Sequence, residues 1–371
     1  MENSVLFNTM SKKDIEVYLT KRQYNNFFFT QFLQWKRKLS LSVETLLSSE
    51  GNHVAADIVA FDSRAPEKKR PITSKMLSDI VPIRVKRTMT EKDLNEYFML
   101  MNLADSESKR DAIGMVYKDI DFVYNAVMAR LEWMFFQMIS HGTMTLSTTT
   151  NVGPVTLDTV DFGLPSANKE YIGSAGGTAA ATHYWNASAK ATNDPIGDID
   201  AIIGEANAAG INPKYLLMDV TKWRLLRQST AFQNWCKVYI SDGTARRTPL
   251  NLRDANVALA NSDYPQIITF NQRITLENAD HTQTSTNPWY DTKYVTFLED
   301  LNVGHMYHVK TAEEQAPAKQ VAYYKKNNVL IAKGRETDPV SEKTVGLINA
   351  FPAWPSISKA YILNTEGHTA F

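Results

Sequence analysis

The sequence predicts an α+β fold organised around one very long helix. Apolar residues recur every three or four positions between Asp105 and Gly142, which is the period of an amphipathic helix. β-prone runs precede this stretch, and helical and strand patterns alternate in a compact region that begins near residue 195. No self-similar period of roughly 20–50 residues is visible, so a repeat architecture is not expected.

The long helix is predicted over residues 106–141. Asp105 or Ser106 is the expected N-cap, and Gly142 is the expected residue just past the C-terminus. About 36 residues span about 54 Å at ~1.5 Å per residue. Glu132 lies one position around the helix from the buried stripe and is expected to face solvent. The predicted stripe consists of Ile113, Val116, Ile120, Val123, Val127, Leu131, Met134 and Met138.

A two-stranded arm with a basic tip is predicted before this helix. Residues 41–45, 54–61 and 80–85 are rich in β-formers, and the segment between them contains two prolines and few apolar residues. Between Asp62 and Arg87 there are 8 basic and 3 acidic residues, and the run Lys68, Lys69, Arg70 marks the tip. A solvated loop tip explains this run, and so does a contact with an acidic neighbour.

A hairpin and then a compact unit are predicted after residue 142. The runs 143–150 and 155–162 are joined by Asn-Val-Gly-Pro, and the polar, glycine-rich residues 163–194 are expected to be a connection that contains a domain boundary. Pro195, after Asp194, is expected to begin a helix that Gly210 ends. Further helices are predicted at 220–227 and 252–260. Strands are predicted at 215–219, 267–270, 294–298, 304–309, 320–324 and 329–332, and the final residues 344–351 and 357–364 are β-prone.

Composition excludes several classes of protein. The 371 residues exceed the length of one ordinary domain, and 43% hydrophobic residues are enough for a sizeable core. The 40 Lys and Arg balance the 40 Asp and Glu, so DNA binding by bulk charge is not the main expected task. The single cysteine, Cys236, allows no intrachain disulfide and no cysteine zinc site. Neither an export signal nor an apolar run of ~20 residues is visible.

No catalytic constellation is predicted. The Gly-rich run 173–177 lacks the Lys-Ser/Thr of a phosphate loop and follows no apolar strand. His305 and His308 would face opposite sides of a strand, so they do not form a metal pair. Cys236 follows Trp235 and has no histidine close in sequence, which is typical of a buried thiol. The chain is therefore not expected to be an enzyme or to hold a cofactor or metal.

Three stretches resemble a known family. They are ARLEWMFFQMISHGTMTL (129–146), NDPIGDIDAIIGEANAAGINPKYLLMDVTKWRLLRQS (193–229) and KGRETDPVSEKTVGLINAFPAWPSISKAYILN (333–364). The predicted order along the chain is an N-terminal arm, a β-hairpin arm, the long helix, the compact unit and a final β-prone segment. Together with this order, the three stretches resemble the major capsid proteins of tailed bacteriophages with the Hong Kong 97-like fold, most closely the lambda-type major capsid protein E family. The resemblance implies an N-terminal arm (1–39), an extended loop (40–90), a peripheral domain with the spine helix (91–194 with 335–371) and an axial domain (195–334).

The resemblance implies a structural function. The chain is expected to self-assemble into hexamers and pentamers that form an icosahedral shell around double-stranded DNA. It is expected to be part of the virion and to be assembled in the cytoplasm of the host bacterium. No long charged helical segment precedes the arm, so a separate scaffolding protein is expected, with portal and decoration proteins as further partners. The alternative interpretation is a shell protein of an encapsulin-like bacterial nanocompartment. A third interpretation is an enzyme with an unfamiliar α+β fold.

The resemblance also gives the basic tip an expected role. Residues 1–100 carry 16 basic and 12 acidic residues, so the arm is net positive and the remainder net negative. Lys68, Lys69 and Arg70 are therefore expected to dock on an acidic surface of an adjacent subunit. An isopeptide crosslink from Lys68 or Lys69, of the kind that some relatives make, is the other role that the position allows.

Overall fold

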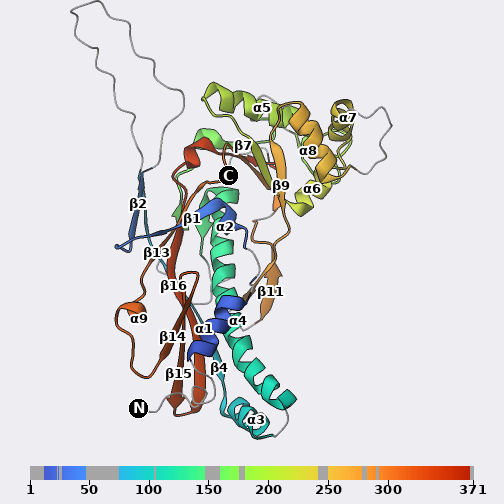
Figure 1. The fold of residues 1–371 in the computed structure, drawn as a ribbon. Coiled ribbons are helices and arrows are strands. Elements are labelled where there is room, and N and C mark those ends of the chain that lie inside the picture. The colour runs from blue at the N-terminus through green and yellow to red at the C-terminus, as the bar shows by residue number, and fades with distance from the viewer. Residues whose placement is uncertain are drawn as a thin grey trace, which may run out of the picture. The chain divides into compact units, whose positions relative to one another are not determined.

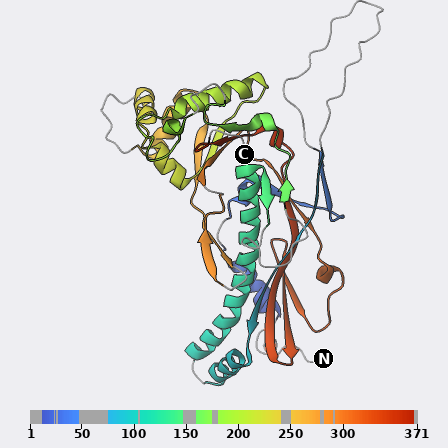
Figure 2. The same ribbon diagram turned by 180° about the vertical axis from the view of Figure 1, so that it is seen from behind.

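The computed structural model describes residues 12–22, 24, 27–46, 75–103, 106–146, 159–174, 180–240, 250–277, 282–289 and 292–367. The chain divides into two compact units. Unit 1 comprises residues 1–43, 78–134 and 305–352, and unit 2 comprises residues 44–77, 135–304 and 353–371. Helices and strands are both abundant, which confirms the α+β prediction (Figures 1 and 2).

Unit 1 is built on a six-stranded sheet. Strand β16 is its longest member and pairs with β15 over Val340–Leu347 and with β4 over Glu342–Asn349, both antiparallel. Asn327 and Asn328, both with positive φ, form the tight turn between β14 and β15. The strand order is β1 (Leu33–Arg37), β13 (Gly304–Val309), β16 (Val340–Ala353), β15 (Val329–Thr337) and β14 (Ala322–Lys326), and β4 (Pro82–Met89) pairs with β16 beside this path.

This sheet corrects one expectation. The strands predicted at 304–309, 320–324 and 329–332 exist, although β14 begins two residues later and β15 runs five residues further than predicted. They were expected to alternate with helices in the compact unit that begins near residue 195, but they pair within the sheet of unit 1. β-propensity marks a segment as a strand and does not choose its partner, and here the partners β4 and β16 are remote in the sequence.

The long helix is confirmed with the predicted C-terminus, and Asp105, one of the two residues predicted as its N-cap, lies outside the described residues. Helix α4 runs over Ser106–His141, which is 36 residues, and Gly142 follows it with φ +67°. Glycine is required at position 142 for two reasons: the positive φ is unfavourable for other residues, and a Cβ there would lie 2.8 Å from the Cβ of Leu164. Ile113 is only half-buried, whereas the other members of the predicted stripe, Val116, Ile120, Val123, Val127, Leu131, Met134 and Met138, are 0–2% exposed.

Unit 2 packs helices on a five-stranded sheet. Its helices begin at side-chain caps: Asp194, Asp219, Ser229 and Asn251 each accept a hydrogen bond from a backbone N–H in the first turn. The strands, in order, are β7 (Lys169–Tyr171), β17 (Tyr361–Asn364), β12 (Tyr294–Leu298), β8 (Tyr215–Asp219) and β9 (Gln266–Phe270), and the helices are α5 (Pro195–Ala208), α6 (Val220–Leu226), α7 (Thr230–Tyr239) and α8 (Leu252–Asn261). The predicted strands at 215–219 and 294–298 and the helices from 195, 220 and 252 are confirmed.

The remaining described elements are short. Of the hairpin predicted after the long helix, the pairing of β5 (Thr143–Thr145) with β6 (Thr159–Asp161) is confirmed, and the predicted connection Asn-Val-Gly-Pro lies outside the described residues. Helices α1 (Lys12–Lys21), α2 (Phe29–Phe32), α3 (Glu91–Asn102) and α9 (Ala312–Gln315), like α7, were not predicted, and strands β10 (Ile274–Glu277) and β11 (Gln283–Thr286) form a separate hairpin. The boundaries of the four predicted domains stay a prediction.

Candidate assembly site

The predicted arm is described at its base. Strands β2 (Ser42–Leu46) and β3 (Lys75–Asp79) pair with each other, and the N–H of Ile80 donates to the C=O of Leu41 at 2.8 Å. The residues predicted at the tip, Lys68, Lys69 and Arg70, lie outside the described residues, as does the predicted run 54–61. Their contact with another subunit therefore stays a prediction.

The arm continues directly into the sheet of unit 1. Strand β4, which follows β3, pairs with β16 from Pro82 opposite Asn349 to Met89 opposite Glu342. Two arginines on β4 add ion pairs: Arg84 lies 3.1 Å from Glu313, and Arg87 lies 3.1 Å from Asp119. The Arg84–Glu313 pair is partly open to solvent, and such ion pairs contribute only ~0–1 kcal/mol, whereas Asp119 of the second pair is buried. The eight-residue backbone pairing is the main anchor of the arm.

A segment near the N-terminus is fastened to the long helix by one carboxylate. Asp121 accepts hydrogen bonds from the hydroxyls of Tyr18 at 2.7 Å and Tyr24 at 2.8 Å, and Arg22 lies 3.4 Å from it. Tyr18 also stacks on Tyr117 with 3.8 Å between ring centroids. Burial, together with the hydrogen bond to Asp121, raises the pKa of Tyr18 to about 12, so its hydroxyl remains a donor at neutral pH.

Sequence reasoning missed this attachment. The aromatic-rich run from Tyr18 to Phe29 carried a signal for packing, but nothing in it identifies Asp121, which is about a hundred residues away, as the shared acceptor. Through these contacts α1 lies against one side of α4, and Ile15 and Leu19 are the buried residues of α1.

The expectation that Glu132 faces solvent is wrong. Its side chain is 1% exposed, and its two carboxylate oxygens accept hydrogen bonds from the backbone N–H groups of Phe28 at 2.9 Å and Phe29 at 3.0 Å. These amides lie at the start of α2, where N–H groups have no partner within the helix. The phase of α4 is correct, but every residue from Leu131 to Ser140 is buried, so this part of the helix has no solvent face.

A second buried charge lies between the sheet and α4. The ammonium of Lys333 is 3.6 Å from a carboxylate oxygen of Glu342, and the two side chains are 1% and 2% exposed. Burial lowers the pKa of Lys333, while Glu342 and Asp119 oppose this shift. Burial likewise raises the pKa of Asp119, and Arg87 and Lys333 oppose that shift. Neither member of the Lys333–Glu342 pair is open to solvent, so the pair is suited to holding strands β15 and β16 together and not to acting on a substrate.

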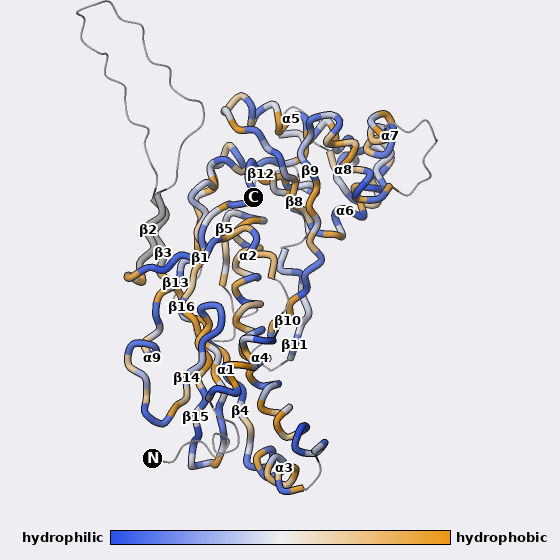
Figure 3. The backbone as a smooth tube through the Cα atoms, viewed as in Figure 1, coloured by the Kyte–Doolittle hydropathy of each residue, from blue (hydrophilic) through white to orange (hydrophobic). Residues whose placement is uncertain are grey.

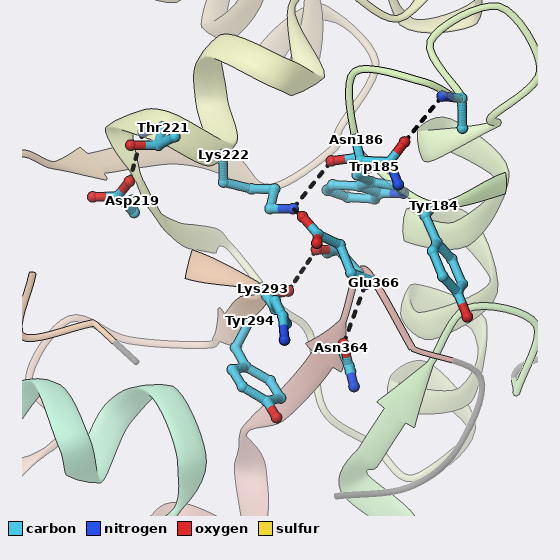
Figure 4. Close-up of polar contacts among 12 residues, drawn as sticks. Tyr184, Trp185, Asn186, Asp219, Thr221, Lys222, Lys293, Tyr294, Asn364 and Glu366 are labelled. Atoms are coloured by element: carbon cyan, nitrogen blue, oxygen red, sulfur yellow. Dashed lines mark hydrogen bonds and ion pairs between the residues drawn. The ribbon is translucent and has the colours of Figure 1, made fainter. Parts of the chain in front are cut away.

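In unit 2 a buried lysine holds the C-terminal segment (Figure 4). Lys222 is fully buried, and its ammonium donates to the C=O of Trp185 at 3.0 Å and to the carboxylate of Glu366 at 2.6 Å. Thr365 adds a backbone hydrogen bond to the C=O of Lys293 at 2.9 Å. Burial lowers the pKa of Lys222, and Glu366 opposes the shift. The segment after β17 is thus attached to α6 and to the loop that contains Trp185.

Cys236, His305 and His308 are the described residues among those weighed for chemistry, and most of the Gly-rich run 173–177 lies outside the described residues. Cys236 is buried, and burial raises the pKa of its thiol to about 12, so the reactive thiolate is scarce at neutral pH. Burial lowers the pKa of both His305 and His308, which lie three residues apart on β13. Within the described ranges, no three His, Cys, Asp or Glu side chains come close enough to hold a metal ion. None of the helices described has the length and apolar character needed to cross a bilayer.

Comparison with known families decides what these units belong to. The sequence profile described as phage major capsid protein E matches residues 18–345. The chain belongs to the phage major capsid protein E family. This capsid protein has no match among curated proteins.

Two solved structures share its fold. A prophage protein of E. coli CFT073 assigned as a capsid protein superposes with a TM-score of 0.57 at 15% identity, covering 95% of this chain and 98% of that chain. A phage-related protein from Bordetella bronchiseptica RB50 gives a TM-score of 0.51 at 9% identity, with 97% and 98% covered. At these identities the two structures support the fold only.

The family match confirms the resemblance found in the sequence. It covers α4, the arm and most of unit 2, and it favours the phage reading over the encapsulin alternative. Membership of a capsid family makes this a structural protein of the virion, and capsid assembly implies an oligomeric shell.

Proposed function

We propose that this capsid protein has the Hong Kong 97-like fold and forms hexamers and pentamers that close into the icosahedral shell of a tailed phage. The observation that carries the proposal is the family match over residues 18–345. In this assignment residues 1–39 are the N-terminal arm, 40–90 the extended loop, 91–194 with 335–371 the peripheral domain, and 195–334 the axial domain.

The arm supports an assembled state. Its described base consists of two strands only, and an isolated two-stranded ribbon is marginally stable in water. A neighbouring subunit would cover it in a shell. The zero net charge of the chain also suits close packing, because many highly charged copies would repel one another.

The basic tip has a defined role in this proposal. Lys68, Lys69 and Arg70 dock on an acidic surface of an adjacent subunit, since the first 100 residues carry a net charge of +4 and the remainder −4. Each such pair is weak, ~0–1 kcal/mol, but a shell repeats it in every subunit. Arm and acidic surface are different parts of one chain, so the contact is heterologous and can form rings.

The proposal also covers the partners of the capsid protein and the site of its assembly. Assembly takes place in the bacterial cytoplasm with a separate scaffolding protein and a portal, and decoration proteins bind the finished shell. The inner surface meets packaged double-stranded DNA without sequence specificity. The role is structural, so no residue is assigned to catalysis and no cofactor is required.

Assembly of the purified chain tests the proposal. The full chain is expressed alone and together with the phage proteins encoded beside it, and the products are separated by sedimentation and viewed by negative-stain electron microscopy. Closed shells or curved sheets of one subunit are the expected result. A monodisperse monomer at high concentration in both preparations would overturn the proposal.

A further inference from the structure

An apolar turn projects from unit 1. Leu39 and Leu41, in the turn between β1 and β2, are 92% and 53% exposed. The backbone tube has the hydrophobic colour at this turn (Figure 3). The turn is fixed at both ends, because the N–H of Lys38 donates to the C=O of His308 at 2.9 Å and the C=O of Leu41 accepts from Ile80 at 2.8 Å. Two leucines are therefore presented to solvent on a backbone that is held in place.

The end of β1 and the turn that follows it are strongly basic. Lys36, Arg37 and Lys38 precede Leu39, and the sequence has no carboxylate between residues 33 and 41. Lys38 lies over the ring of Tyr307, 4.2 Å from its centroid. Lys36 and Arg37 are exposed, and no carboxylate in the described part of the chain pairs with either of them. We call residues 36–41 the basic knob.

Helix α3 presents a surface of the opposite charge. Met99 is 71% exposed and Leu103, at the end of the helix, is 49% exposed. Glu96 lies one turn before Met99, on the same side, and is also exposed. Residues 91–103 contain three carboxylates and one lysine. We call this surface the α3 face.

The α3 face is held as firmly as the knob. Thr90 and Asp93 form a reciprocal capping box at the start of the helix, and Leu94 and Tyr97 on its inner side are 5% and 0% exposed. The helix packs on unit 1 through Leu94 and Tyr97, so Met99 and Leu103 are not needed for that packing and stay exposed.

We propose that the basic knob of one copy docks on the α3 face of a second copy. Leu39 and Leu41 would cover Met99 and Leu103, while the positive charge at the end of β1 would attract the carboxylates of α3. The two surfaces lie toward different ends of unit 1 in both views of the ribbon, so one chain cannot join them to each other (Figures 1 and 2). The contact is head-to-tail, which extends from copy to copy. It rests on the proposed function and adds a contact between subunits that does not involve the arm tip.

A charge exchange tests the pairing. Lys36→Glu with Arg37→Glu forms one variant, and Glu91→Lys with Glu96→Lys forms the other. Each alone is expected to reduce the yield of sedimenting particles severalfold without changing the thermal unfolding of the unassembled subunit. Their combination in one chain is expected to restore the yield, because the attraction is rebuilt with reversed sign. If the combination assembles no better than the worse single variant, the pairing is wrong.

A chemical crosslink locates the contact directly. In assembled particles that carry Leu39→Cys and Met99→Cys, a short bis-maleimide is expected to produce a ladder of linked subunits. The matched control carries Leu39→Cys and Val257→Cys, because Val257 is 45% exposed but lies on α8 of unit 2, and the native Cys236 is buried. Particles that form normally but give no more crosslink than this control would overturn the contact and leave the shell proposal intact. A wild-type chain that forms no particles would instead overturn the shell proposal, and the docking with it.

Discussion

Replacing Glu132 by alanine removes the acceptor that holds the start of α2 against α4. Oε1 accepts from the N–H of Phe28 at 2.9 Å and Oε2 from the N–H of Phe29 at 3.0 Å. Alanine keeps the helix propensity of α4 high but offers neither amide an acceptor. The side chain is 1% exposed, so water reaches the two amides poorly once the carboxylate is gone.

The expected loss of stability is large. Hydrogen bonds to charged groups contribute ~1.5–3 kcal/mol each, and a buried donor left without a partner costs ~1–3 kcal/mol. Two such amides give an expected decrease of ~3–5 kcal/mol in the free energy of unfolding of the Glu132→Ala chain, which is comparable to a core truncation such as Leu131→Ala at ~2–5 kcal/mol. Glu132→Gln keeps one acceptor oxygen and is expected to lose about half as much.

Denaturant unfolding of the unassembled chain, followed by circular dichroism, measures this difference. Lys118→Ala is the matched control, since Lys118 is exposed on the same helix and its loss is expected to stay within about 0.5 kcal/mol. Limited proteolysis is expected to cut Glu132→Ala between residues 22 and 38 faster than the control. An unfolding midpoint for Glu132→Ala equal to that of Lys118→Ala would refute the assignment of the carboxylate as the acceptor.

Three further changes have definite expected outcomes. Reversing the charges of Lys68, Lys69 and Arg70 together is expected to lower particle yield while the subunit still folds; a normal yield contradicts the docking of the arm tip. Burial raises the pKa of Asp198 to about 6, above its unfolded value, so the free energy of unfolding falls by on the order of 2–3 kcal/mol as the pH rises from about 4 to about 7, and Asp198→Asn should remove most of this pH dependence. If thermal unfolding of the two chains has the same pH profile, folding does not raise the pKa of the Asp198 carboxyl. Lys222→Ala is expected to lower the free energy of unfolding by ~2–4 kcal/mol by leaving a carbonyl and a carboxylate without their donor, and an unchanged melting temperature would contradict that role.

Local features of the fold were predictable because their causes lie within a few residues of one another. The period of the apolar residues and Gly142 with its positive φ specify α4 to its last residue. Pro195 after the cap Asp194 specifies the start of α5 in the same way. These signals depend on backbone geometry, which the neighbouring residues determine.

Contacts between distant segments were not predictable. Glu132 was expected in solvent because it is a charged residue beside the apolar stripe, and nothing in residues 106–141 reveals that α2 covers this position. Asp121 binds Tyr18 and Tyr24 across about a hundred residues, and Lys222 binds Glu366 across 144. The candidate assembly surfaces follow the same rule: the charge of the basic knob is visible in the sequence, but the exposure of Leu39 is not.

Cryo-electron microscopy of particles from cells that produce this chain with the rest of its phage tests the central claim most directly. The account predicts closed icosahedral shells of hexamers and pentamers, with this chain as the repeating subunit and double-stranded DNA inside the mature particle. Shells that enclose protein and no DNA, or particles whose shell is made of a different protein, would contradict it.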